Sequence, residues 1–243
     1  TLKVVSKNLG GRGSTPQATK ERDAFYTECM GNSADVILIQ ETHCASLNEF
    51  KKHSPMGWKA FHSGTSTQSA GVGILINPKS NIKPAVAAHE IIPGRAMAIT
   101  LKWEGVEITV ASVYLTSGSN ERITRQTELQ TIEGFVTSMA QGEGKNNIIF
   151  GGDWNCIEHQ IDIKRFPPLK QETYQRGNKD DLMHFQQNLK LEDWYHTAYS
   201  PSPDDKTPQN SAYEYTHTKI NKSNQLFTRL DRFYTSTNIA CMM

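Results

Sequence analysis

An acid and an amide stand two residues apart after a short apolar run, in Ile148-Ile149-Phe150-Gly151-Gly152-Asp153-Trp154-Asn155. Apolar runs of this length that are bounded by glycine are typical of buried strands. Side chains two apart lie on one side of an extended chain, so Asp153 and Asn155 would share one side at the carboxyl end of that strand. Such a pair suits a metal-bound water and a phosphate oxygen. Taken alone, the stretch fits a Gly-Asp turn closed by an Asx hydrogen bond equally well.

Gly151 and Gly152, which precede the acid, have two interpretations. Glycine lets the backbone turn sharply where a strand ends, and it also lets another group approach the backbone closely. The sequence leaves both open.

Polar side chains stand at the ends of, or within, other predicted strands: Asn8, Glu41, Tyr114 and Asp231. An acid after a buried strand is either exposed at the sheet edge or paired with a cation, and a metal ion is one such cation. Each of these residues, judged alone, is also an ordinary turn or core residue. Their order along the chain is more informative than any single one.

The elements that would position these residues alternate between strands and helices. Strands are expected over 2–6, 35–40, 58–62, 71–77, 82–92, 95–103, 106–115, 213–217 and 226–234, in addition to the run that begins at Ile148. Helices are expected from Thr15-Pro16 to about Met30, over 121–139 and over 180–189. The helix 121–139 carries an apolar stripe and connects two strands, which predicts a strand–helix–strand unit. Residues 161–178 are irregular and basic.

Composition limits the classes of function. The chain has 243 residues with no internal repeat or linker, so a single domain over 1–243 is expected. Hydrophobic residues make up 37% and charged residues 21%, with no segment as long as a membrane span. A net charge of +1 means that a nucleic-acid partner would have to bind a local patch. The four cysteines form no CxxC or CxxH pair, which argues against zinc and favours free thiols in a reducing compartment.

In their order and spacing, these sites resemble the endonuclease/exonuclease/phosphatase superfamily, which has the DNase-I-like fold. The matching segments span nearly the whole chain: Asn8, Gln40-Glu41-Thr42, Val113-Tyr114, Gly152-Asp153-Trp154-Asn155 and Arg229-Leu230-Asp231. The resemblance implies an α/β fold, a two-sheet α/β sandwich of DNase-I-like type with flanking helices. The active site would lie at one end of the sheets.

Within the superfamily, the sequence most resembles the apurinic/apyrimidinic-like endonuclease domain of LINE-type (non-LTR) retrotransposons. The likeness is carried by Glu41-Thr42-His43, the stretch 162–165, Leu191-Glu192-Asp193-Trp194, Tyr215-Thr216 and the stretch 229–232. Abasic-site repair enzymes usually carry an acid two residues after the first asparagine. This chain has Gly10 there, which argues against the repair branch.

The resemblance implies metal-dependent hydrolysis of a phosphodiester. Glu41 would hold Mg²⁺, with Asn8 assisting and Mn²⁺ as an alternative ion. Asp153 would orient or deprotonate the attacking water. Asn155 and Tyr114 would donate hydrogen bonds to the phosphate.

Asp231 resembles the family's aspartate that orients a catalytic histidine. In the family that histidine lies in a Ser-Asp-His motif a little beyond this strand, and the sequence ends at Met243 without it. We expect 1–243 to be a single endonuclease domain that lacks this C-terminal segment, and a catalytically inactive domain is the alternative. His43 matches a position near the site and would help to position DNA or other site residues.

DNA contacts are expected from basic and polar side chains after Asn155 and near the last strands: Lys164, Arg165, Thr216, Lys222, Arg229 and Arg232. The segment 220–225 resembles the hairpin that enters the minor groove in LINE-type relatives. Any single one of these basic residues is also an ordinary surface charge.

The resemblance predicts an intracellular Mg²⁺-dependent enzyme that nicks double-stranded nuclear DNA. The nick would expose a 3′-hydroxyl that primes target-primed reverse transcription by another part of the same polypeptide. One alternative keeps the fold and makes the chain a phosphatase or phosphodiesterase. The other is a catalytically inactive DNA-binding module.

Overall fold

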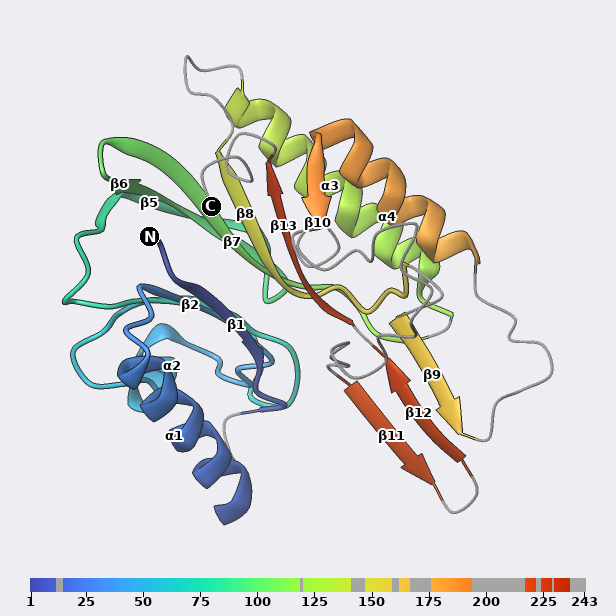
Figure 1. Ribbon diagram of the computed structural model, residues 1–243, viewed down its shortest axis with the longest axis horizontal. Coiled ribbons are helices and arrows are strands. Elements are labelled where there is room, and N and C mark those ends of the chain that lie inside the picture. Colours follow the sequence, from blue (N-terminus) through green and yellow to red (C-terminus); the bar gives the residue numbers. More distant parts are fainter. Residues whose placement is uncertain are drawn as a thin grey trace, which may run out of the picture.

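Two mixed β-sheets form the centre of the structure, a computed structural model of the chain (Figure 1). The structure describes residues 1–11, 15–118, 120–140, 147–158, 162–166, 176–193, 217–221, 224–228 and 230–236. The four-stranded sheet has the order β1-β2-β4-β3, with β1 parallel to β2 and the other neighbours antiparallel. Its strands are β1 (Val4–Asn8), β2 (Val36–Gln40), β3 (Lys59–Ser63) and β4 (Val72–Ile76).

The second sheet has six strands in the order β10-β13-β8-β7-β6-β5. Its strands are β5 (Lys83–Ile92), β6 (Ala96–Trp103), β7 (Val106–Tyr114), β8 (Ile148–Asp153), β10 (Leu191–Asp193) and β13 (Asp231–Ser236). The only parallel pair in it, among the described residues, is β7 with β8. This pair and the helix between them form the predicted strand–helix–strand unit.

A third, three-stranded sheet lies beyond the start of β13 (Figure 1). It consists of β9 (Ile163–Phe166), β11 (His217–Asn221) and β12 (Asn224–Thr228), all antiparallel. Two expectations are corrected here. The stretch 161–178 contains a strand, and the run 226–234 is divided between β12 and β13 because its two halves pair with different sheets.

Helices cover the outer faces of the two large sheets (Figure 1). They are α1 (Pro16–Gly31), α2 (Leu47–Lys52), α3 (Arg122–Ala140) and α4 (Arg176–Leu189). Helices α1 and α2 pack on the four-stranded sheet through Tyr26 and Phe50, and α3 and α4 pack on the six-stranded sheet through Ile132 and Phe185. None of the helices within the described ranges is long and apolar enough to cross a membrane.

The two sheets pack face to face across an apolar core. Leu38 of β2 and Ile74 of β4 belong to the same buried cluster as Ile99 of β6 and Val110 of β7. The other face of β2 packs on the helices through Ile37 and Ile39. Strand β2 is apolar at consecutive positions because both of its faces are buried. The predicted α/β sandwich of two mixed sheets is confirmed.

Gly151 and Gly152 lie inside β8, which runs straight through them to Asp153. A Cβ on Gly152 would collide with the backbone carbonyl of Val113 in the neighbouring strand, and a Cβ on Gly151 would lie 2.6 Å from Leu38 Cδ1. Close approach therefore explains both glycines, and a sharp turn does not.

The variant Gly152→Ala is expected to be strongly destabilised, because a methyl group there meets backbone atoms that cannot rotate away. We expect a loss of about 3 kcal/mol or more in the free energy of unfolding, at the upper end for overpacked cores. Gly134→Ala is the matched control: nothing lies near its Cβ position in α3, and alanine favours a helix over glycine by about 1 kcal/mol. Urea unfolding measures both, and equal midpoints would contradict the prediction.

Cys29, Cys44 and Cys156 are buried free thiols, as expected from the sequence. Cys241 lies outside the described residues.

Candidate active site

The predicted site residues meet where four strands end. Asn8 is the last residue of β1 and Glu41 follows β2, and these two strands are parallel neighbours. Tyr114 and Asp153 are the last residues of β7 and β8 and face each other in the parallel register. Asp231, the first residue of β13, is the antiparallel partner of Asp153.

The side-chain amide of Asn8 joins two carboxylates from different sheets. Its Nδ2 donates to Glu41 Oε1 at 2.8 Å and to Asp153 Oδ2 at 3.0 Å. Its Oδ1 accepts the backbone N–H of Gly10 at 2.9 Å, which fixes the orientation of the amide. Glu41 and Asp153 are thereby held next to each other at the boundary between the sheets.

Glu41 has two further neighbours. The hydroxyl of Tyr114 hydrogen-bonds to its carboxylate, and the Nε2 atom of His43 lies 3.5 Å from its Oε2. Burial raises the pKa of Tyr114 to about 12, and the negative charge of Glu41 and the hydrogen bond to it act in the same direction. Tyr114 is therefore a protonated donor and not a phenolate.

We expect Tyr114 to keep its proton well above the ordinary tyrosine pKa of 10.0, up to about pH 12. Because the folded state binds this proton more tightly, its stabilising contribution is complete below pH 10.0 and is lost as the pH rises toward about 12. The phenolate absorbance of the wild-type protein minus that of Tyr114→Phe measures this titration. A difference midpoint at the ordinary value, in folded protein, would contradict it.

Arg95 is a site residue that the sequence analysis missed. Its guanidinium lies over the ring of Tyr114, 4.8 Å from the ring centroid, and its backbone carbonyl accepts the N–H of Tyr114. It stands just before β6, where the sequence shows no recognisable motif. Its position brings a permanent positive charge next to Tyr114.

Asn155 has a left-handed backbone, with φ of 46°. Its N–H donates to Asp153 Oδ1 at 2.9 Å, so the Asx hydrogen bond that the sequence suggested is present at the end of the strand. Its side-chain Nδ2 donates to the carbonyl of Leu115 at 2.7 Å. An amide nitrogen carries two hydrogens, and the second is the one that a phosphate would require.

Two buried residues of α3 hold the loop that Asn155 contacts. Arg125 Nη1 donates to the carbonyls of Thr116 and Gly118, both at 2.8 Å. Glu128 accepts the N–H of Thr116 at 2.9 Å. The helix therefore fixes the segment that follows Tyr114, and with it the acceptor of the Asn155 amide.

Arg232 does not lie on a DNA-facing surface, and that expectation is wrong. The side chain is buried, Nη2 pairs with Asp162 Oδ2 at 3.0 Å and Nη1 donates to the carbonyl of Cys156 at 2.7 Å. Glu158 and Asp193 lie 3.7 and 3.8 Å from Nε. Arg232 neutralises part of a buried acidic cluster and ties β13 to the segment after β8.

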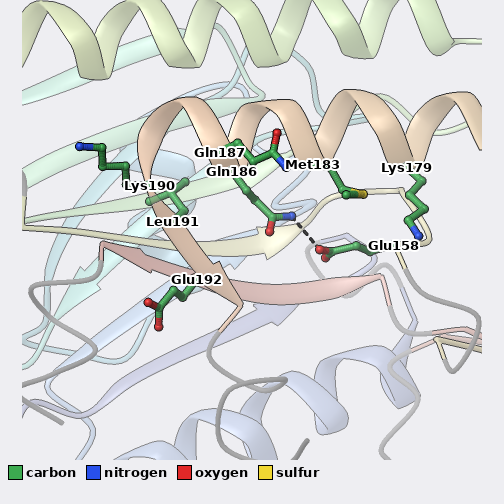
Figure 2. A pocket seen from close by; sticks show the side chains of 8 residues that line it. All are labelled: Glu158, Lys179, Met183, Gln186, Gln187, Lys190, Leu191 and Glu192. Carbon is green, nitrogen blue, oxygen red and sulfur yellow. Dashed lines mark hydrogen bonds between the residues drawn. The ribbon is translucent and has the colours of Figure 1, made fainter.

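A surface pocket adjoins this cluster (Figure 2). Its lining comes from α4, from β10 and from Glu158, whose Oε1 accepts a hydrogen bond from Gln186 Nε2 at 2.9 Å. None of its lining residues is a predicted site residue.

The other predicted DNA contacts stay predictions. Lys164 and Arg165 belong to β9, whose backbone pairs with β12, and their side chains lie outside the described part. Thr216, Lys222 and Arg229 lie outside the described residues.

The two-sheet sandwich with this site, together with the family match of the sequence, indicates a hydrolase of the nuclease or phosphodiesterase kind. The sequence matches the Endonuclease/Exonuclease/phosphatase family over residues 5–240, and the chain belongs to this family. A search of curated proteins gave no match.

Two solved structures share the fold. The endonuclease domain of TRAS1, a telomere-specific non-LTR retrotransposon, aligns with a TM-score of 0.63 and 17% identity, over 98% of this chain and 86% of that chain. The AP endonuclease LMAP from Leishmania major aligns with a TM-score of 0.69 and 16% identity, over 99% of this chain and 80% of that chain. These similarities confirm the DNase-I-like fold.

Proposed function

We propose that this chain is a Mg²⁺-dependent endonuclease that nicks double-stranded DNA. The observation that carries the proposal is the Asn8 amide, which holds Glu41 and Asp153 together beside Tyr114. Two acids, a protonated phenol and the Arg95 cation are the groups that phosphodiester hydrolysis needs in one place.

The donor set fits a magnesium ion. Within the described ranges, no group of three His, Cys, Asp or Glu side chains is arranged so that it could hold a metal ion by itself. Mg²⁺ typically binds one or two carboxylates and keeps several waters, which matches the pair Glu41 and Asp153. Glu41 would hold the ion with Asn8 assisting. The bound ion would neutralise the phosphate oxygens and stabilise the leaving 3′-oxygen.

The chain's own residues have separate roles. Asp153, fixed by Asn8 and by the N–H of Asn155, would orient or deprotonate the attacking water. Tyr114 and Asn155 would donate to the phosphate, and Arg95 would attract it. Asp231, next to Asp153 in the sheet, would orient a catalytic histidine, as the corresponding aspartate does in the family.

The proposed biological role draws on the likeness to retrotransposon endonucleases. The nick would leave a 3′-hydroxyl in nuclear DNA, and a reverse transcriptase in the same polypeptide would extend it. The match in fold to the TRAS1 endonuclease domain supports this role.

Nicking of supercoiled plasmid by this chain and by its Asp153→Ala variant tests the proposal. We expect open circles from the wild-type chain in Mg²⁺, none in EDTA or from Asp153→Ala, and nicked ends that a DNA polymerase can extend. DNA binding without cleavage would favour the inactive module. Phosphate release from small phosphoesters without nicking would favour a phosphatase.

A further inference from the structure

The segment Glu41-Thr42-His43 has an unusual backbone. Glu41 has φ of 51° and His43 has φ of 48°, so both residues that flank Thr42 are left-handed. Residues other than glycine rarely adopt this conformation, which costs about 1–3 kcal/mol at each position. The surrounding structure must hold the segment in place.

Part of that restraint is backbone hydrogen bonding. Thr42 N–H donates to the carbonyl of Gly71 at 3.1 Å, and His43 N–H donates to the carbonyl of Ala70 at 3.0 Å. The carbonyl of Glu41 accepts the N–H of Gly11 at 2.8 Å. These bonds fix the path of the chain.

A further restraint comes from the side chain of Thr42, which is buried. Its Oγ1 is 2.9 Å from His62 Nε2 on β3. The His62 ring stacks on Phe50 of α2, with centroids 4.9 Å apart and an interplanar angle of 23°. Burial lowers the pKa of His62 to about 4, so the ring is neutral at physiological pH.

Glycines lie against each side chain of this group, where a larger residue would not fit. A Cβ on Gly71 would collide with Thr42 Oγ1, and a Cβ on Gly64 would lie 2.6 Å from His62 Cε1. A Cβ on Gly73 would collide with the Phe50 ring. The close fit leaves Thr42 and His62 little freedom to move apart.

We propose that His62 is a positioning residue, which holds Thr42 and thereby keeps Glu41 and His43 in the left-handed conformation that directs them to the site. The geometric part of this inference stands on the contacts above. Its consequence for catalysis rests on the proposed function.

Amide hydrogen exchange followed by NMR tests the geometric part. The variants are His62→Leu and Thr42→Val, which remove the hydrogen bond, and His62→Gln, which restores a nitrogen near the position of Nε2. We expect the first two to accelerate exchange of the Thr42 and His43 amides by about tenfold, the effect of one buried hydrogen bond. His62→Gln should restore slow exchange.

The amides of Leu38 and Ile39 in β2 are the internal control, and their exchange should not change. Unchanged exchange at Thr42 and His43 in His62→Leu would overturn the inference. Equal acceleration at β2 would also overturn it, because His62 would then stabilise the fold as a whole.

Mg²⁺ titration tests the catalytic part, with two readouts: the rise in melting temperature and the half-saturation of plasmid nicking. Partners that orient a metal ligand typically change metal affinity by about 10–100-fold, and we expect His62→Leu to raise both Mg²⁺ midpoints by that factor. The nicking rate at saturating Mg²⁺ should stay near wild type, and His62→Gln should restore the midpoints.

Glu41→Gln separates the two proposals. If the wild-type protein shows no Mg²⁺ response, or if Glu41→Gln responds to Mg²⁺ like the wild type, the proposed function is wrong. The hydrogen-exchange result then still decides the geometric inference by itself. Faster exchange in His62→Leu with wild-type Mg²⁺ midpoints would overturn the proposed effect of His62 on metal binding.

Discussion

Replacing Asp153 by asparagine is expected to reduce plasmid nicking by about 10²–10⁴-fold, the range for loss of a general base. The side chain keeps its shape, so the carbonyl oxygen of the new amide can still accept the N–H of Asn155, which Asp153 Oδ1 accepts at 2.9 Å. The new amide nitrogen takes the place of Oδ2 and cannot accept the hydrogen bond from Asn8 Nδ2. The negative charge beside Glu41 and the ability to take a proton from water are lost as well. The measurement is the rate of open-circle formation at saturating Mg²⁺.

Asp181→Asn is the matched control for this variant. Asp181 is also a hydrogen-bonded carboxylate, but its partners are Arg122 and Gln126 on α3, and it contacts none of the site residues. We expect this control to nick at the wild-type rate. If Asp153→Asn did so as well, the assignment of Asp153 would be wrong.

Replacing the buried Arg232 is expected to have the largest effect on the free energy of unfolding. Arg232→Met would leave Asp162, Glu158 and Asp193 buried without their guanidinium. Breaking a buried ion pair from one side typically costs about 3–5 kcal/mol, because the remaining charge is uncompensated. The urea midpoint should fall accordingly.

A double variant tests this cause directly. Adding Asp162→Asn to Arg232→Met removes one of the uncompensated charges and should recover part of the lost stability. Arg122→Met is the control, because Arg122 is exposed and pairs with Asp181 at the surface, where ion pairs contribute little. An unchanged urea midpoint for Arg232→Met would refute this account of the cluster.

The positions of the central site residues could be predicted from the sequence because each stands at the end of a recognisable strand. Asn8, Glu41, Tyr114 and Asp153 all stand at strand ends, and parallel strands bring their carboxyl ends to one edge of a sheet. The unit β7-α3-β8 could also be predicted, because the apolar pattern of each of its elements lies within that element's own sequence.

Features that depend on contacts between distant segments could not be predicted. In the sequence, Arg232 cannot be distinguished from an ordinary surface arginine. Only the fold brings it to Asp162, which is 70 residues away in sequence. The run 226–234 contains no Gly or Pro and resembles one strand, so nothing local marks Leu230 as the point where one sheet ends and another begins. Arg95 lacks a motif because stacking on Tyr114 is a tertiary contact.

Helix α2 was also not predicted, although the signal for its start is present in the sequence. Ser46-Leu47-Asn48-Glu49 has the S-x-x-E pattern of a helix start, and Ser46 Oγ accepts the N–H of Glu49 at 3.2 Å. The helix has only 6 residues, too few for its apolar periodicity to be recognised.

The hydrogen bonds from Asn8 to Glu41 and Asp153 link the two halves of the sandwich, since Glu41 follows a strand of one sheet and Asp153 ends a strand of the other. The catalytic geometry is therefore sensitive to how the sheets are aligned with each other. A misplacement of about 1 Å can cost about 10²-fold in rate. Changes in the apolar layer between the sheets, far from any phosphate, can thus control activity by sliding one half of the protein relative to the other.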